Sequence, residues 1–400
     1  MDLSSLMGGN MPSIPSAGDG APKKDAPPPF EYKAQAASPT VSGEASLTIG
    51  KDSLMVASPM SVAEITFAGI NAVEFANYAV TVKSDDGDYV FSRMGEWAER
   101  FCDALREAWG RAVLRAFFVK GSPLLTATGD YSFSEDGALV SGAKAAIHVY
   151  DNCVAAMPSE GGARRVPLCF VTAVEKGQFQ YTLKLGTGES YTFSRLGYDT
   201  DPFANTVERQ IKALREKALA TVKEIDATLT ATQASQIANL LPEGAAAEIG
   251  QLAAIAPSFL DALERKIEQT RMGEGYAAFK EMCDPAMIWT GVDWMIAPSP
   301  DGRYAAVEFA EADTATFVYK TGGDFPMFAA KLNRALEAIS FKREVIRLTD
   351  EELLAPEYAD YFMASRRTAS LQFVRANFAQ RVIHSSADAW RRSLSEAWGA

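Results

Sequence analysis

Two similar stretches decide the fold of this sequence: Tyr89-Val90-Phe91-Ser92-Arg93-Met94-Gly95 and, further along, Tyr191-Thr192-Phe193-Ser194-Arg195-Leu196-Gly197. Each follows an Ala-Val-Glu segment, at 72–74 and at 173–175, and the two spacings differ by one residue. A match kept over about 80 residues, with insertions confined to loops, indicates an internal duplication. The same comparison extends downstream, where we match Leu125-Thr126-Ala127-Thr128 with Leu229-Thr230-Ala231-Thr232.

Alternating apolar residues predict two hairpins within each copy. In the first copy, apolar residues alternate with polar ones at 47–49 and again at 54–56, on either side of a polar turn at 50–52. A second hairpin surrounds Asp85-Asp86-Gly87-Asp88, where Asp-Gly supplies the positive φ angles that a tight turn needs. In the second copy the glycines at 186–188 take this role.

The apolar period changes from two to 3.6 after each repeated Arg-x-Gly segment, which predicts one amphipathic helix at the end of each unit. An antiparallel sheet with one apolar face, followed by such a helix, belongs to the α+β class. The predicted helical stripes are Trp97, Phe101, Leu105, Ala108 and Ala112 in the first copy, and Phe203, Val207, Ile211 and Leu214 in the second.

A second pair of shorter repeats is predicted in the C-terminal part. The segment 307–313 matches 371–377 without gaps, and 294–297 loosely matches 361–364. Each match precedes an apolar stripe at helical spacing, so we expect two short strand-helix units joined to the first pair by an alanine-rich helical linker. The stripes are Phe325, Phe328, Leu332, Leu336 and Ile339, then Trp390, Leu394 and Trp398.

The duplicated units resemble a known family. The segment 65–74, followed by a hairpin, by 89–95 and by a helix, looks like bacterial pleckstrin-homology-like (PH-like) or GRAM-like domains, and 166–175 begins the same pattern in the second copy. The resemblance implies tandem antiparallel β-sandwiches or barrels, each closed by one C-terminal helix. The C-terminal units lack a hairpin of this pattern and fit as degenerate relatives.

These observations divide the chain into six expected segments. They are a disordered Pro/Gly/Ser-rich tail at 1–42, a PH-like unit at 43–140, a second at 141–223, a helical linker at 224–275, and short strand-helix units at 276–340 and 341–400.

Composition and charge restrict the function. The net charge of −12 disfavours general attraction to nucleic acid or to an anionic bilayer, so we expect no nucleic-acid partner. The sequence opens without the basic start and apolar run of a signal peptide, and it contains no run of about 18 apolar residues. We therefore expect a cytoplasmic protein.

The sequence shows no motif for bond-making chemistry, so we predict no enzymatic activity, no catalytic residues, no cofactor and no metal. The two histidines, His148 and His384, lie at predicted strands without a triad or metal set, and the four cysteines are isolated, as buried reduced thiols are. Glu74 with Arg93, and Glu175 with Arg195, recur at matching places and suggest structural ion pairs.

Arginines gather near the C-terminus, interleaved with aromatic residues. We expect them to contact an acidic protein, a phosphate-bearing ligand or another subunit; a solvated helix face is the alternative. The first hairpins carry only one lysine between them, at 50–52 and 150–152, which departs from the basic hairpins that hold phosphoinositides in related eukaryotic domains. The predicted partner-binding residues are Arg366, Arg367, Arg375, Arg381, Arg391 and Arg392.

Repetition without catalytic residues favours a non-enzymatic adaptor or scaffold that binds a protein or peptide through sheet edges or the groove between sheet and helix. One alternative is peripheral binding to a membrane or anionic lipid through the basic C-terminal unit. A second is an enzyme whose site the sequence does not reveal. Homo-oligomerisation through exposed strands is also left open, and the sequence does not identify the partner.

Overall fold

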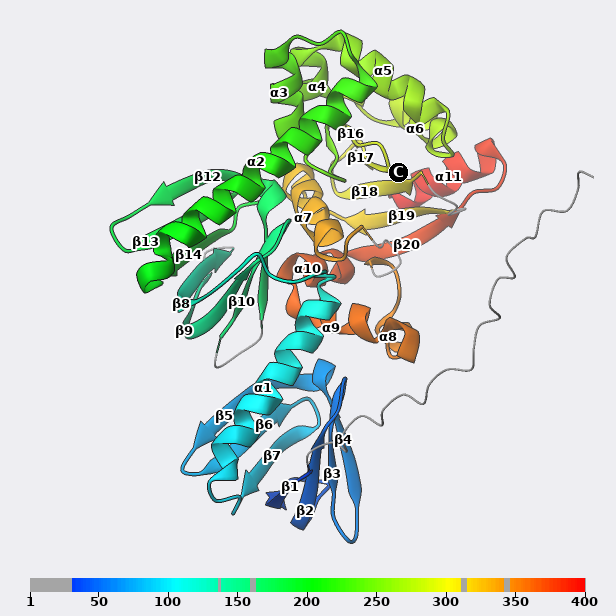
Figure 1. Cartoon of the computed structure of the whole chain (residues 1–400). Coiled ribbons are helices and arrows are strands. Elements are labelled where there is room, and N and C mark those ends of the chain that lie inside the picture. The colour runs from blue at the N-terminus through cyan, green and yellow to red at the C-terminus, as the bar shows by residue number, and fades with distance from the viewer. Residues whose placement is uncertain (1–30, 136–137, 159–162, 311–314, 342–345, 400) are drawn as a thin grey trace, which may run out of the picture.

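The computed structural model describes residues 31–135, 138–158, 163–310, 315–341 and 346–399. The chain builds a first unit (31–118), a second unit (124–225) and a third body (226–399) that contacts both (Figure 1). The fold is mixed α+β with antiparallel sheets, as the sequence predicts. Within the described residues, no helix combines the length and apolar character needed to cross a membrane.

The first unit is a seven-stranded antiparallel sheet followed by one helix. Its strand order is β4-β3-β2-β1-β7-β6-β5. Alternate strand residues face the core, where α1 places Phe101 and Leu105 against them. The elements are β1 (Glu31–Ala37), β2 (Ser42–Ile49), β3 (Ser53–Ala57), β4 (Val62–Thr66), the 3-10 turn η1 (Phe67–Gly69), β5 (Ile70–Ala76), β6 (Ala79–Ser84), β7 (Gly87–Ser92) and α1 (Trp97–Ala116).

The second unit repeats this arrangement with the order β11-β10-β9-β8-β14-β13-β12. In both units, among the described residues, the two outermost strands pair on one side only, so each sheet is open. Of the expected sandwich or barrel, the closed barrel is therefore wrong. The elements are β8 (Leu125–Glu135), β9 (Ala138–Val149), β10 (Cys153–Met157), β11 (Arg164–Pro167), η2 (Leu168–Phe170), β12 (Val171–Lys176), β13 (Gln180–Leu185), β14 (Ser190–Ser194) and α2 (Thr200–Ile225).

The repeated Arg-x-Gly segment forms the same turn in both units. Arg93 and Arg195 have φ of 58° and 55°, and Gly95 and Gly197 both have φ of 60°. Two left-handed residues reverse the chain between the last strand and the helix, and the residue between them, Met94 or Leu196, is buried. The motif therefore fixes how each helix leaves its sheet.

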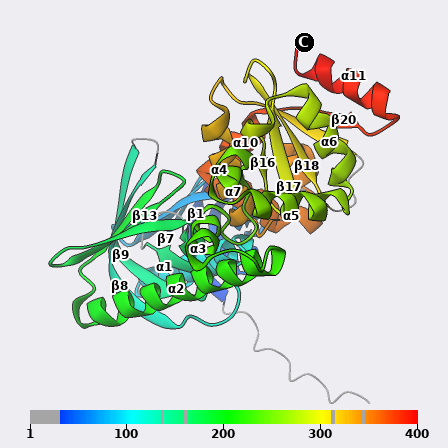
Figure 2. The same ribbon diagram turned by 90° about the horizontal axis from the view of Figure 1, so that it is seen from above.

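The third body is a six-stranded antiparallel sheet, ordered β15-β16-β17-β18-β19-β20, between two helical layers (Figure 2). Trp294 and Phe317 face the layer of α7, α9 and α10, whereas Met295 and Val318 face the layer of α3 to α6 and α11. The elements are α3 (Ala231–Leu240), β15 (Ala247–Glu248), α4 (Ile249–Ile255), α5 (Pro257–Glu268), α6 (Met272–Met282), β16 (Trp289–Thr290), β17 (Trp294–Pro298), β18 (Tyr304–Phe309), β19 (Ala315–Lys320), α7 (Phe325–Ala338), α8 (Asp350–Leu353), α9 (Ala359–Arg367), α10 (Ala369–Ala376), β20 (Phe378–Ile383) and α11 (Ala387–Ala397).

Two predicted boundaries of the duplicated part are wrong. Of the tail expected at 1–42, residues 1–30 lie outside the described residues. The rest of this prediction is wrong, because 31–37 form β1 in the middle of the first sheet. The first unit was expected to reach residue 140, but 125–135 form β8, which pairs with β9 and β14 of the second sheet. The sequence match of 125–128 with 229–232 has no structural counterpart, because 125–128 lie in β8 whereas 229–232 lead into helix α3.

The prediction of two C-terminal repeats is also wrong. Segment 307–309 is strand, whereas 371–376 is helix α10, and 361–364 lies in helix α9 instead of a strand. The segments expected as separate units share one sheet, because β20 pairs with β19. The predicted helices around Phe325 and Trp390 are confirmed as α7 and α11, and the helical segment 231–282 covers one face of this sheet instead of serving as a linker.

The repeated acidic residues pair with lysines and not with the arginines expected. Glu74 Oε1 lies 2.6 Å from Lys83 Nζ across the β5–β6 hairpin, and Glu175 pairs with Lys184 at the same place in the second unit. Arg195 instead lies 3.0 Å from Asp130 on β8.

Candidate functional site

A cleft of about 580 Å³ lies between the second unit and the third body. On the second unit its wall is formed by η2, the start of β12 and one stripe of α2, with Ile211, Leu214 and Ala218 spaced along one helix face. Arg215 closes this wall by donating from Nη2 to the carbonyl oxygen of Val171 at 3.1 Å. The wall is mostly apolar, as in sites that bind apolar groups with a few polar contacts.

The opposite wall comes from α3, β15, β16 and α7 of the third body. Asn333 of α7 lines the cleft and holds residue Ala246 at both backbone groups, accepting from its N–H and donating to its carbonyl oxygen, each at 2.9 Å. Trp294 Nε1 donates to the carbonyl oxygen of Gly244 at 2.9 Å. These bonds fix the loop before β15 against the core.

Two edge strands border the cleft. β12 is the last strand of the second sheet, and Val171 and Thr172 at its start line the cleft. β15 is the edge of the third sheet, and its residues Ala247 and Glu248 line the other side. An edge strand presents backbone N–H and carbonyl groups on its outer side, so both walls place a sheet edge beside an extended segment. On β12 the carbonyl oxygen of Val171 already accepts from Arg215.

Polar groups at the cleft include one unpaired donor. Trp289 Nε1 is buried and has no hydrogen-bond partner among the described residues. Gln251 Nε2 donates to Glu248 Oε2 at 2.7 Å. Burial raises the pKa of the Cys169 thiol well above its ordinary value, so this cysteine stays a neutral thiol and is a poor nucleophile.

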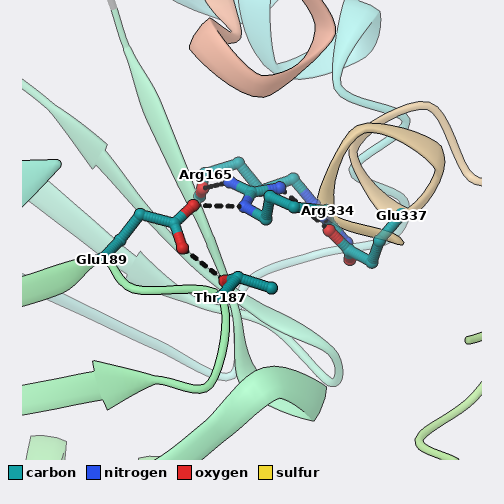
Figure 3. A network of polar contacts seen from close by, with 5 residues as sticks. All are labelled: Arg165, Thr187, Glu189, Arg334 and Glu337. Carbon is teal, nitrogen blue, oxygen red and sulfur yellow. Dashed lines mark hydrogen bonds and ion pairs between the residues drawn. The ribbon is translucent and has the colours of Figure 1, made fainter. Parts of the chain in front are cut away.

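A buried ion network joins the two walls just behind the cleft (Figure 3). Arg334 of α7 lies 3.0 Å from Glu189 Oε1 through Nε and 3.2 Å from Glu337 Oε2 through Nη1. Arg334 Nη2 also donates to the carbonyl oxygen of Arg165 at 3.1 Å, and the Arg165 guanidinium pairs with Glu337. Glu189 accepts in addition from Thr187, which lines the cleft.

On the first unit, the surface that corresponds to this cleft is covered by helix α9 of the third body. Counted from the shared glycines Gly95 and Gly197, Trp109 and Ile211 occupy the same helix position. Trp109 contacts η1 by donating from Nε1 to the carbonyl oxygen of Phe67 at 3.1 Å, and the guanidinium of Arg367 at the end of α9 lies 5.1 Å from its ring. Figure 1 shows α9 against the end of α1.

Further contacts hold α9 on the first unit. The rings of Phe118 and Tyr361 lie 5.5 Å apart, and Arg115 Nε lies 3.1 Å from Asp360 Oδ1. At the other end of the helix, Arg366 Nη2 lies 2.8 Å from Asp85 Oδ1. The equivalent surface of the second unit, formed by η2 and α2, lines the open cleft.

The structure disperses the six arginines predicted to bind a partner. Arg366 and Arg367 contact the first unit, Arg375 pairs with Asp350 at 2.6 Å, and Arg391 pairs with Glu281. Arg366 and Arg375 both border a groove of about 500 Å³ beside 346–350. The remaining two, Arg381 on β20 and Arg392 on α11, are exposed elsewhere. Their role as a common binding surface stays a prediction.

The two histidines lie far apart in different bodies. His148 Nδ1 is 3.0 Å from Thr126 Oγ1 on the neighbouring strand. His384 Nε2 is 2.9 Å from Oε1 of the buried Glu308, within a polar group that also includes Thr316 and Trp390. This group joins β18, β19 and the residue after β20 to α11. Thr316 is fully buried, which favours a structural role over nucleophilic chemistry.

Neither the cleft nor the ion network was predictable as a site from the sequence. Arg334 and Glu337 are charged residues three apart on a helix whose other residues are largely apolar, which is the only signal that the sequence offered for a buried pair. Their partner residues Arg165 and Glu189 lie in another unit, so no local pattern connects them.

Comparisons with known proteins do not assign a family. No protein-family model matches the chain, and no curated protein matches it. A solved structure described as the crystal structure of DNA polymerase sliding clamp from Pseudomonas aeruginosa with ligand aligns at 9% identity, covering 78% of this chain and 81% of that chain, with a TM-score of 0.10. A likeness this weak carries no argument about fold or function.

Proposed function

We propose that the protein is a non-enzymatic adaptor that holds a short segment of a protein partner in the cleft between the second unit and the third body. The units that carry the binding surface are, in this proposal, tandem PH-like domains. The shared strand order of both sheets, the single helix after each, and the common Arg-x-Gly turn support that relationship. The chain then uses two copies of one scaffold for two docking events.

The observation that carries the proposal is the occupied site on the first unit. There, the surface of η1 and the end of α1 binds a segment of the chain itself, α9, through apolar rings and ion pairs at both ends of the helix. The corresponding surface of the second unit is apolar, is bordered by two edge strands and forms one wall of the open cleft. A duplicated docking surface with one copy filled internally leaves the other for a segment from outside.

The apolar wall residues supply the contact area, and backbone hydrogen bonds to the edge strands would fix the orientation of the bound segment. A segment that buries two or three large apolar side chains gains roughly 1.5–3 kcal/mol from each before the cost of ordering is subtracted. Trp289 Nε1 offers a further donor to a carbonyl oxygen of the bound segment.

A peptide selection on the full chain tests the proposal. Peptides from a displayed random library are enriched on the wild-type protein and then measured against Asn239→Trp, which adds an indole at an exposed cleft position on α3. The matched control is Gln236→Trp, on an exposed position of the same helix that does not line the cleft. We expect affinity to fall about tenfold or more, equivalent to ~1.4 kcal/mol, for Asn239→Trp only. Failure to enrich any peptide, or equal binding to both variants, contradicts the proposal.

A further inference from the structure

A second and smaller cavity lies where the first unit, the second unit and the third body meet. Its volume is about 20 Å³. Phe117 at the end of α1, Arg165 on β11, Arg334 on α7 and Ser370 on α10 all line it. A cavity needs ~10–15 Å³ of occupied volume to hold one water, so this cavity is on the scale of a single small molecule or ion.

Donors without partners gather in the residues around this cavity. Among the described residues, Arg165 Nε, both Nε and Nη2 of Arg367, and Ser370 Oγ are buried and make no hydrogen bond. Arg165 is 6% exposed and Ser370 is 2% exposed, and all three residues line the cavity. A buried donor that lacks an acceptor is destabilising, and more so when it is charged, so a group that accepts from several of them is strongly favoured.

The local charge is unbalanced toward the positive. Arg165 and Arg334 are neutralised by Glu189 and Glu337 in the ion network (Figure 3). Two more arginines, Arg164 and Arg367, line the same cavity without a carboxylate ion pair of their own among the described residues, which leaves two positive charges. Arg164 lies over the ring of Phe133, with its guanidinium 4.3 Å from the ring centroid.

The surroundings of Arg367 point to the same deficit of negative charge. Asp85, an acidic residue whose charge acts on Arg367, is already bonded to Arg366. Burial, followed by repulsion from Arg366, lowers the pKa of Arg367 to about 10. The ring of Trp109 beneath the guanidinium offers only a weak counterpart to a buried cation.

Helix α10 begins at the cavity. Its N-cap residue Thr368 and its first two residues, Ala369 and Ser370, line the space. Among the described residues, the Thr368 side chain makes no capping hydrogen bond. The first N–H groups of a helix have no partner within the helix, and they carry the positive end of its dipole. This geometry adds backbone donors to the guanidinium groups.

We propose that this cavity binds a small inorganic dianion of the phosphate or sulfate class, which holds the two units and the third body together. The planar guanidinium groups and the helix N-terminus are the donors that tetrahedral oxyanions prefer, and two negative charges match the excess of two positive ones. The space is too small for a phosphorylated peptide or a lipid headgroup. The anion therefore stabilises the arrangement of the chain and is not displayed to a partner.

Thermal unfolding of the full chain tests this site. The midpoint Tm is measured in sodium chloride and at matched ionic strength with millimolar sodium phosphate, for the wild type, Arg367→Met and Ser370→Ala. The control is Arg392→Met, which removes an exposed arginine on α11. We expect phosphate to raise Tm saturably for the wild type and the control, less for Ser370→Ala, and not at all for Arg367→Met.

General stabilisation by salt would raise the Tm of all four proteins alike, whereas binding at this site depends on Arg367. Without phosphate, Arg367→Met should unfold at the same temperature as the wild type or at a higher one, because it no longer buries an unpaired cation. An equal rise in Tm with phosphate in every variant overturns the proposal, and so does the absence of a rise in the wild type. A crystal structure grown in phosphate that shows only an ordered water in the cavity also overturns it. If Arg367→Met does not fold, the comparison of Ser370→Ala with the wild type decides.

Discussion

Arg334 in α7 and Glu189 beside β14 form an ion pair, with Nε and Oε1 3.0 Å apart, in which both side chains are less than a tenth exposed. The two residues belong to different parts of the chain, and their bond ties the third body to the second unit. Because neither charge reaches water, each depends on the other and on Glu337 for its stabilisation.

Removing one member of this pair should therefore cost more than removing both. Glu189→Gln leaves the Arg334 guanidinium with one carboxylate fewer, and we expect the free energy of unfolding in urea to fall by about 3–5 kcal/mol. The double variant Glu189→Met with Arg334→Met leaves the balanced pair Arg165 and Glu337, so its loss should be smaller than that of Glu189→Gln. Additive losses in the cycle of Glu189→Met, Arg334→Met and their combination would contradict the description of the network.

The two copies of the Arg-x-Gly turn should respond equally to substitution. Gly95 and Gly197 share φ of +60°, and among the described residues nothing lies within 4 Å of an added Cβ at either position. Gly95→Ala and Gly197→Ala should therefore each lose about 1–2 kcal/mol of unfolding free energy through backbone strain alone. Asparagine, which tolerates this conformation, should cost less. Clearly unequal losses in urea denaturation would show that the two turns are not equivalent.

The two histidines should give stability profiles of opposite sign with pH. The hydrogen bond that the protonated ring donates to Glu308 raises the pKa of His384 above 6.5, despite burial, and the negative charges of Glu308 and Glu274 add to this. The protonated form is thus favoured in the folded state. Its contribution is complete below about pH 6.5 and is lost as pH rises through the higher folded value. We expect His384→Asn to remove this decline from a plot of Tm against pH.

Burial lowers the pKa of His148 below 6.5, so the sign reverses. The unfolded chain binds a proton that the folded chain does not, and stability falls as pH drops below about 6.5 toward the lower folded value. His148→Asn should flatten the acidic side of the Tm profile and leave the alkaline side unchanged. The same profile for both variants would rule out these assignments, and NMR titration of each ring provides an independent reading.

The wall of the cleft should depend on Asn333. Asn333→Leu keeps a similar volume but leaves the N–H and the carbonyl oxygen of Ala246 buried without partners, so we expect a loss of at least about 1–3 kcal/mol in unfolding free energy. The control Asn239→Leu changes an exposed asparagine on the same cleft and should be nearly neutral. A neutral Asn333→Leu would mean that the loop before β15 is held by other contacts.

The duplicated units were predictable because each carries its own local signals. Alternation at 47–49 and the Asp-Gly turn before β7 correctly predicted hairpins, and the period change after Gly95 correctly predicted a helix. β1 was missed because its buried residues, Ala34 and Ala36, are small and alternate only weakly with their neighbours. Its pairing with β7 connects residues far apart in sequence, which no local pattern shows.

The third body could not be predicted in the same way. β17 is buried at every residue, so its sequence Trp294–Pro298 lacks the alternation that identifies a strand with one exposed face. Apolar residues at 307, 309 and 310 recur at 371, 373 and 374, a spacing that both a strand and a helix accept. Tertiary contacts resolve this choice, because β18 pairs with β17 and β19 whereas 371–374 pack within helix α10 against α7.

Hydrogen exchange of the full chain with a peptide selected on it tests the cleft as a docking surface most directly. We predict slower exchange of backbone amides in β12 (Val171–Lys176), in β15 and in the half of α2 around Leu214. We predict no change in β5 (Ile70–Ala76), which follows the 3-10 turn η1 against which α9 already docks. Protection confined to other surfaces, with β12 and β15 exchanging as in the free protein, would contradict the proposed function.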